Sequence, residues 1–155
     1  MEKNKFEDTG NGRLLVLIRI SGMVKIREEV QETLNRLRLR RKYSCVLVDK
    51  NNKNIWGMIK KVRHYIAYGE IEKGILEKLI KERSESLEGR KKKFKFDEKE
   101  IASGLMNGRS LISFKLKPFF RLHPPRKGIR AKLQYPDGVL GDNKKDINKL
   151  IERML

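Results

Sequence analysis

The sequence predicts a single domain of the α/β (or α+β) class, with a β-α-β-α-β core in which helices pack on one face of a small three-stranded sheet. Three observations support this prediction. Apolar residues alternate with period two over Leu14 to Ser21, and a second β-rich segment covers Tyr43 to Asp49. Helical spacing of apolar residues follows each segment. Finally, 155 residues suffice to bury one core.

Both faces of the first expected strand are largely apolar, which is typical of a central strand. Leu14, Val16 and Ile18 fall on one face, whereas Leu15 and Leu17 fall on the other. The second expected strand contains the only cysteine of the chain, Cys45. We therefore expect Cys45 to be a core residue rather than a thiolate nucleophile.

Amphipathic helices are expected to form most of the remaining secondary structure. The spacing predicts a helix over Lys25 to Leu39 and a second helix that ends near Ile66. Asparagines before the second helix and Asp97 before a later one are candidate N-caps. Further helices are expected at Glu70 to Leu87, Asp97 to Met106 and Asp146 to Leu155, and the third strand at Phe119 to Leu122.

The domain organisation follows from these elements. Residues 1–12 are polar and are expected to form a flexible tail, and residues 13–155 are expected to form one domain. Its core covers about 13–84 together with the third strand at about 119–122. A helical insertion at about 85–117 separates the two parts, and a basic extension follows over 123–155.

The net charge of +18, from 38 Lys and Arg against 20 Asp and Glu, indicates a polyanionic partner. Nucleic acid is the first expectation and an anionic membrane surface the second. The longest apolar run, Leu14 to Ile18, is too short to span a bilayer. The first dozen residues do not resemble a signal peptide, and a single cysteine fits a reducing compartment. We therefore expect a cytoplasmic protein.

The sequence lacks the residue patterns of most enzymes. It has two histidines, His64 and His123, and no cysteine cluster, so no metal site is expected. No GxGxxG motif follows the first strand, and no Walker-type loop is present. We expect no catalytic residue, no cofactor and no small-molecule substrate.

The basic residues are segregated into clusters. Ten Lys and Arg lie between Arg36 and Arg63 with a single acid, five lie in Arg90 to Lys95, and seven lie in Lys115 to Lys132 with no acid. A solvated charged surface is the alternative interpretation of each. RNA is favoured over DNA because no recognition helix, zinc finger or basic zipper is evident. The candidate RNA-binding residues are Arg38, Arg40, Arg41, Lys42, Lys60, Lys61, Arg63, His64, His123, Arg126, Lys127, Gly128, Arg130 and Lys132.

His123 precedes two prolines and is therefore expected to be extended. Its ring is expected either to stack or hydrogen-bond with RNA, or to pack under the loop. The Pro-Pro-Arg-Lys-Gly order of residues 124–128 combines stiffness, charge and close backbone approach, which suits a phosphate contact.

Several segments, taken together and in order, resemble the large-subunit ribosomal protein L-thirty family. The most specific is Gly57-Met58-Ile59 followed by Val62. The others that carry the resemblance are Thr33 to Arg41, Val46 to Asp49 and Ile55 to Ile66. The archaeal and eukaryotic branch of the family, often called L-seven-e, is resembled by Ala67 to Glu70, Arg121 to Gly128 and Ile147 to Met154.

The resemblance implies a ferredoxin-like arrangement of the core and a structural role, without catalysis, in the large ribosomal subunit of the cytoplasm. It implies large-subunit rRNA as the partner, with 5S rRNA as one candidate, together with neighbouring ribosomal proteins. Lys127 departs from the family, which commonly has a glycine there. Two alternative functions remain open at this point: an RNA-modifying or processing enzyme, and a general basic protein that compacts nucleic acid.

Overall fold

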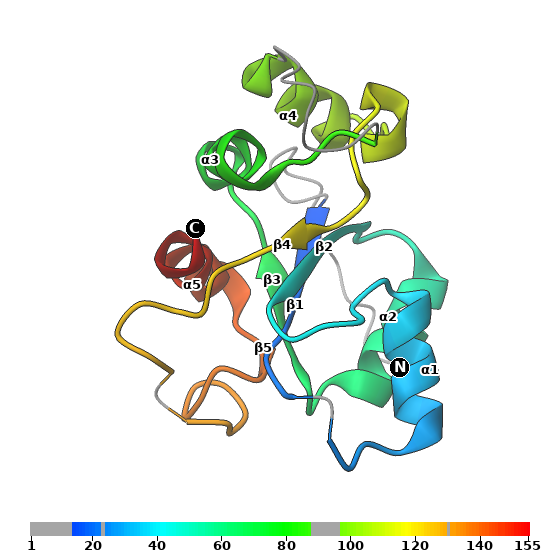
Figure 1. The fold of residues 1–155 in the computed structure, drawn as a ribbon, viewed down its shortest axis with the longest axis vertical. Helices are drawn as coiled ribbons and strands as arrows, with labels where there is room; N and C mark the ends of the chain where they lie inside the picture. Colours follow the sequence, from blue (N-terminus) through cyan, green and yellow to red (C-terminus); the bar gives the residue numbers. More distant parts are fainter. Residues whose placement is uncertain (1–13, 23, 88–96, 130) are drawn as a thin grey trace, which may run out of the picture.

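The computed structural model describes residues 14–22, 24–87, 97–129 and 131–155. Within these residues five strands form one mixed sheet in the order β4-β2-β1-β3-β5 (Figure 1). The strands are β1 (Leu14–Arg19), β2 (Ser44–Asp49), β3 (Ile66–Glu70), β4 (Phe120–Arg121) and β5 (Gly141–Asp142).

Helices connect and cover the strands. The α-helices are α1 (Glu28–Arg36), α2 (Lys53–Val62), α3 (Lys73–Arg83), α4 (Glu98–Met106) and α5 (Ile147–Met154). Two 3₁₀ helices found in the described residues are η1 (Leu111–Phe114) and η2 (Lys144–Asp146). In the described ranges no helix is both long and apolar enough to cross a bilayer.

Strand β1 lies at the centre of the sheet, as the sequence predicts. All six of its residues are buried, and it pairs antiparallel with both β2 and β3. Leu17, for example, lies opposite Val46 on β2 and Tyr68 on β3. The short strand β4 pairs antiparallel with the outer edge of β2, and β5 pairs parallel with β3.

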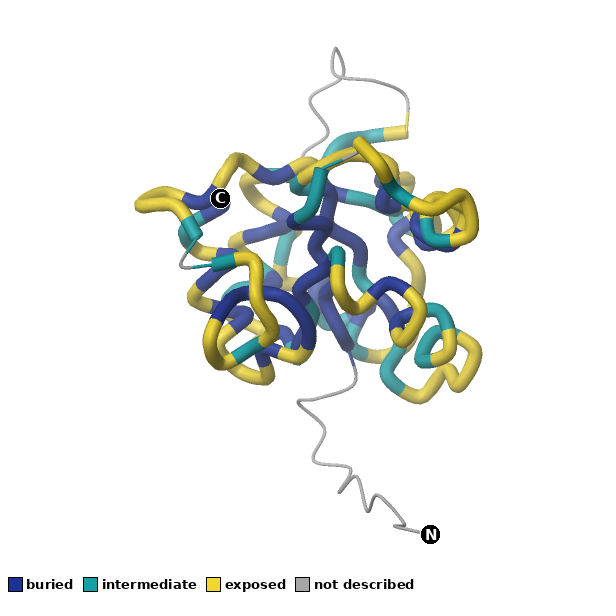
Figure 2. Tube along the Cα trace, turned by 90° about the horizontal axis from the view of Figure 1, so that it is seen from below, coloured by how far each residue is buried: buried dark blue, intermediate teal, exposed yellow. Residues whose placement is uncertain are grey.

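The two faces of β1 contribute apolar side chains to two separate hydrophobic clusters. Val16 and Ile18 belong to a cluster with apolar residues of α3, α4 and α5, whereas Leu15 and Leu17 belong to a cluster with α1 and α2. Figure 1 shows these helix groups on opposite sides of the sheet, and Figure 2 shows the buried strands between them. The prediction that helices pack on one face is therefore wrong, because a strand that is apolar on both faces needs cover on both.

The prediction of three strands is also wrong, although the α+β class is confirmed. The third strand in chain order is β3, which covers the place where the sequence predicts the end of one helix near Ile66 and the start of another at Glu70. Ile66 continues the helical spacing of α2, but α2 ends at Val62 and Ile66 pairs with Arg19 on β1. Long-range pairing thus overrides local periodicity. Residues 119–122 do contain a strand, β4, but it lies at the sheet edge.

The predicted helix caps at Asn52 and Asp97 are confirmed. The side chain of Asn52 accepts a hydrogen bond of 3.1 Å from the backbone N–H of Asn54 at the start of α2. The side chain of Asp97 likewise accepts a bond of 3.0 Å from the N–H of Lys99 at the start of α4. Each cap pairs one backbone donor that the helix cannot satisfy itself.

Gly69 allows β3 to pass directly beneath η2 and α5. A Cβ atom there would lie 2.4 Å from the carbonyl oxygen of Lys144 and 2.8 Å from Cγ2 of Ile147. We expect Gly69→Ala to lower the free energy of unfolding by about 2 kcal/mol, because backbone must move to accommodate the methyl group.

Gly57 provides the matched control. It is an exposed glycine in α2, and no atom lies within 4 Å of the place that an added methyl group would take. Gly57→Ala is expected to raise stability by about 1 kcal/mol through helix propensity. Urea denaturation followed by circular dichroism measures both changes. Equal shifts in the two variants would contradict the tight contact at Gly69.

Candidate nucleic-acid interface

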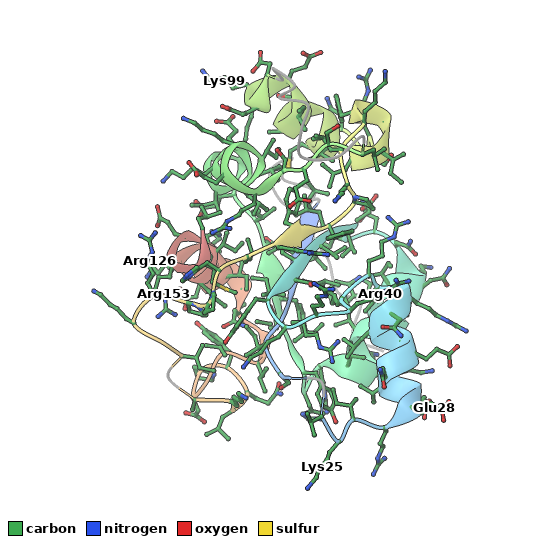
Figure 3. All side chains as sticks on the ribbon, viewed as in Figure 1. Lys25, Glu28, Arg40, Lys99, Arg126 and Arg153 are labelled. Carbon is green, nitrogen blue, oxygen red and sulfur yellow. The ribbon has the colours of Figure 1, made fainter. Side chains whose placement is uncertain are left out.

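A surface hollow lies between the α1–β2 connection and the segment that enters β4. Its volume is about 380 Å³. Figure 3 shows Arg40 at the end of α1 opposite to Glu28, on this connection. We call the hollow the arginine pocket; it is lined by Arg38, Arg40, Arg41, Ser44, Pro118, Phe119 and Arg121.

The end of α1 aims the first arginine of this pocket. The N–H of Leu39 donates to the carbonyl of Leu34 at 2.9 Å, and the N–H of Arg38 donates to that of Asn35 at 3.0 Å. These two bonds form a Schellman motif, whose left-handed position glycine usually occupies. Here that position holds Arg38, with φ of 63°. An arginine is strained in this conformation, so its side chain is retained at a cost in stability.

The side chain of Arg19 holds the same connection from inside the protein. It is 1% exposed, and its guanidinium donates to the carbonyls of Leu39 at 2.8 Å and Arg40 at 3.0 Å. Two weaker bonds of 3.3 Å reach the carbonyls of Ser21 and Gly22. Burial lowers the pKa of the Arg19 guanidinium, which nonetheless stays protonated. By holding these carbonyls, the Arg19 guanidinium fixes the backbone that carries the pocket arginines.

Arg19 supports the site without being one of the candidate site residues that the sequence predicts. The signal that could have found it is a single cation between Ile18 and Ile20 in an otherwise apolar strand. A buried charge requires partners, and the nearest candidates are the carbonyls at the ends of the neighbouring elements.

The pocket arginines are available to an external anion. In the part of the chain that the structure describes, the side chains of Arg38, Arg40, Arg41 and Arg121 make no hydrogen bond or ion pair. By contrast, Arg36 on α1 pairs with Glu32 at 2.6 Å. Among the described residues no carboxylate lines the pocket, so the charges that line it there are all positive.

The predicted residue Lys42 lies next to the pocket arginines in the chain but is not among the residues that line the pocket. Lys42 is exposed, and its Nζ lies 5.1 Å from the ring centroid of Tyr43. This cation–π contact orients the ammonium group near the surface.

The basic loop after β4 is fixed to the end of α5. The N–H of His123 donates to the carbonyl of Met154 at 2.9 Å, and the N–H of Arg126 donates to that of Arg153 at 3.1 Å. The guanidinium of Arg153 in turn donates to the carbonyl of Gly128 at 3.0 Å. The first two bonds satisfy carbonyls in the last turn of α5, which would otherwise lack helical partners.

This docking gathers a second cationic group, which we call the loop–α5 patch. Its residues line a hollow of about 380 Å³ and are Arg126, Lys127, Lys149, Glu152 and Arg153. Figure 3 shows Arg126 and Arg153 beside α5. His123 lies at the start of the same loop and is exposed, so its ring does not pack under the loop; its Nδ1 lies 2.7 Å from the carbonyl oxygen of Pro124.

Lys127 and Gly128 both adopt left-handed conformations, with φ of 65° and 70°. Glycine adopts such angles without strain, whereas lysine does not. We expect Lys127→Gly to raise the free energy of unfolding by about 1 kcal/mol, because lysine is strained there. Thermal unfolding of the variant and of a Lys132→Gly control tests this. A Lys127→Gly variant less stable than the parent would contradict it.

The third cationic group lies at the end of α2. Lys60, Lys61, Arg63 and His64 are all exposed, and Lys61 lies 3.6 Å from a carboxylate oxygen of Glu29. The extension after the basic loop contacts the end of α2 through Gln134. Nε2 of Gln134 lies 3.4 Å from the carbonyl of Arg63 and 3.3 Å from Nδ1 of His64.

Some predicted residues join none of these groups. Lys132 is exposed on the extension. Arg130 and the run Arg90 to Lys95 lie outside the described residues. Phe119 and Arg121 were missed by the sequence analysis as site residues, since their place in the pocket depends on pairing between β4 and β2.

Two other kinds of chemical group matter for function: a reactive thiol and side chains that bind a metal ion. Cys45 is fully buried, and burial raises the pKa of its thiol, so the expectation of a core residue is confirmed. The described ranges hold no group of three or more side chains suited to bind a metal ion.

An α+β fold that presents segregated cationic surfaces is typical of nucleic-acid-binding proteins. Residues 15–66 match the family model described as ribosomal protein L30p/L7e. The large ribosomal subunit protein uL30 of Archaeoglobus fulgidus is 34% identical over 152 residues, which cover 91% of this chain and 99% of that protein. The chain therefore belongs to the ribosomal protein L30p/L7e family.

Two further relatives extend this comparison. The large ribosomal subunit protein uL30 of Methanopyrus kandleri is 36% identical over 148 residues, which cover 86% of this chain and 99% of that protein. The uL30 protein of Desulfurococcus amylolyticus is 35% identical over 161 residues, which cover 92% and 99%. The family resemblance noted in the sequence is thus confirmed well beyond the segment that the family model matches.

Proposed function

We propose that this protein is a structural constituent of the large ribosomal subunit that binds and stabilises folded rRNA through its basic surfaces. The observation that supports rRNA contact is the set of guanidinium groups in the arginine pocket that pair with no carboxylate, where the described lining residues include no acid. The curated relatives are named large ribosomal subunit proteins and match this chain over nearly their full lengths.

Family membership indicates a structural role rather than an enzymatic one, so the RNA-modifying alternative is not favoured. The chain acts within the ribosome, with rRNA and other ribosomal proteins as its partners. We include 5S rRNA among the candidate partners. In this proposal residues 13–155 act as one domain, and the tail expected at residues 1–12 lies outside the described residues.

The physical basis is phosphate neutralisation. Each Lys or Arg that meets a phosphate releases condensed counterions, and this release favours binding at low salt. Arginine also matches phosphate with two parallel N–H donors, which fixes orientation. In our proposal the arginine pocket, the loop–α5 patch and the end of α2 each hold a different stretch of rRNA backbone.

Co-sedimentation with large ribosomal subunits in moderate salt tests the proposal. The full chain is expected to pellet with large subunits and to remain in the supernatant with small subunits alone. Failure to pellet with large subunits would overturn the proposal. Equal affinity for duplex DNA and for rRNA fragments at matched salt would favour a general compacting protein instead.

In this proposal the basic loop contributes part of the affinity for rRNA. Replacing Arg126 and Arg130 by alanine is expected to make the slope of log affinity against log salt shallower by about one to two for an rRNA fragment. Lys81→Ala on α3 serves as the control, because Lys81 is exposed and belongs to none of the three cationic groups. An unchanged slope in the double variant would remove the loop from the RNA contacts.

A further inference from the structure

The arginine pocket differs from the other cationic surfaces because an aromatic ring lines it. Phe119 is half-buried at the pocket wall, and the guanidinium carbon of Arg121 lies 5.7 Å from the centroid of its ring. The described residues that line the loop–α5 patch, a hollow of similar volume, include no aromatic ring and do include the carboxylate of Glu152. Contact with the phosphate backbone alone does not require a ring.

We propose that the arginine pocket binds a single unpaired RNA nucleotide, whose base stacks on the Phe119–Arg121 pair while guanidinium groups of Arg38, Arg40 and Arg41 hold its phosphates. This inference rests on the proposed function, since it takes RNA as the partner. It adds a ligand of defined chemistry, a nucleotide turned out of its stack, to a surface otherwise expected to hold only backbone.

The strand period places the two stacking groups together. Phe119 and Arg121 flank Phe120, so they point to one face of β4 while Phe120 points to the other and is buried. Register with β2 sets Arg121 opposite Ser44, which also lines the pocket. The ring of Phe119 packs against the core cluster that contains α1 and α2, and this contact holds it in place.

The chemistry of the pocket suits a nucleotide. Unpaired bases stack on aromatic rings and on guanidinium planes, and such stacking tolerates any base because each has a π face. Phosphate requires cations that are not already paired with a carboxylate, and in the described residues the side chains of Arg38, Arg40 and Arg41 make no hydrogen bond or ion pair. A volume of about 380 Å³ is at the small end of ligand pockets, which suits one nucleotide.

The pocket is also pre-organised. The buried guanidinium of Arg19 fixes the carbonyls of Leu39 and Arg40, and the Schellman motif fixes the direction of Arg38. Pro118 restricts the backbone directly before Phe119. The pocket therefore loses less conformational entropy when a nucleotide binds, and this smaller loss favours affinity.

Titration of the full chain with AMP, ribose 5-phosphate and inorganic phosphate tests the proposal, with backbone amide shifts in NMR spectra as the readout. We expect AMP to bind about tenfold more tightly than ribose 5-phosphate, because stacking adds to the phosphate contact. The amide shifts caused by both ligands are expected at residues 38–44 and 119–121. Equal affinity of AMP and ribose 5-phosphate would overturn the proposal.

Substitution of the ring isolates the stacking contribution. Phe119→Leu is expected to lower AMP affinity to the level of ribose 5-phosphate while leaving ribose 5-phosphate binding unchanged. Phe119→Trp, which retains a ring, is expected to keep the AMP preference. Phe114→Leu is the control, because that ring lies against Gly104 on α4. A preference that survives Phe119→Leu would contradict the base-stacking role.

The outcome is separable from the proposed function. A chain that pellets with large subunits but binds AMP and ribose 5-phosphate equally retains the ribosomal role and loses the nucleotide pocket. A chain that prefers AMP but never pellets with large subunits loses the ribosomal role instead.

Discussion

Replacing Arg19 by methionine is expected to lower the free energy of unfolding by about 3 kcal/mol. The substitution keeps much of the buried volume but leaves the carbonyls of Leu39 and Arg40 without their donor. Each unsatisfied buried carbonyl costs about 1–3 kcal/mol, and loss of a charged donor is at the upper end of this range. Urea denaturation followed by circular dichroism measures the change.

Matched variants separate this effect from the loss of a charge. Arg36→Met on α1 removes an exposed guanidinium and is expected to change stability by less than about 0.5 kcal/mol. Arg19→Lys keeps the charge but cannot reach several carbonyls at once, so we expect it to fall between the two. If Arg19→Met were as stable as Arg36→Met, other contacts would have to hold the α1–β2 connection.

Removing the guanidinium groups of Arg38, Arg40 and Arg41 together is expected to weaken binding to an rRNA fragment at least about a hundredfold at low salt. Charge-assisted hydrogen bonds contribute about 1.5–3 kcal/mol each, and the triple alanine variant loses several of them. The slope of log affinity against log salt is expected to become shallower by about two to three. Fluorescence anisotropy at several salt concentrations measures both quantities.

The control for this prediction removes the same net charge from elsewhere. Lys73, Lys81 and Lys99 are exposed lysines on or near α3 and α4 that belong to none of the cationic groups described above. Alanine at these three positions is expected to weaken binding by less than about threefold. An equal loss in both triple variants would mean that net charge alone governs binding.

The sequence predicts the elements of this fold better than their arrangement. Local signals, such as the asparagine and aspartate caps and the apolar stripe of α2, were sufficient to place helices. Strand β3 was missed because Ile66 satisfies a helical and a strand pattern equally well, and only pairing with β1 decides between them. The apolar character of both faces of β1, visible at Leu15 and Val16, already implied helices on both sides.

The candidate site shows the same division between local and long-range information. Arg38, Arg40 and Arg41 are interrupted in the chain only by Leu39, so their proximity is predictable from sequence. Phe119 and Arg121 join them only because β4 pairs with β2. The supporting role of Arg19 depends on a bond across the interior, and periodicity contains no information on such a bond.

The bonds between the basic loop and α5 link the loop's shape to the order of synthesis. The carbonyls that accept from His123 and Arg126 belong to Met154 and Arg153, near the end of the chain. A nascent polypeptide that has reached residue 130 has already made every cation of the loop, but it has not made the helix on which the loop rests. The loop therefore acquires its final form only after α5 has been translated, so prematurely terminated chains present the charges without the shape.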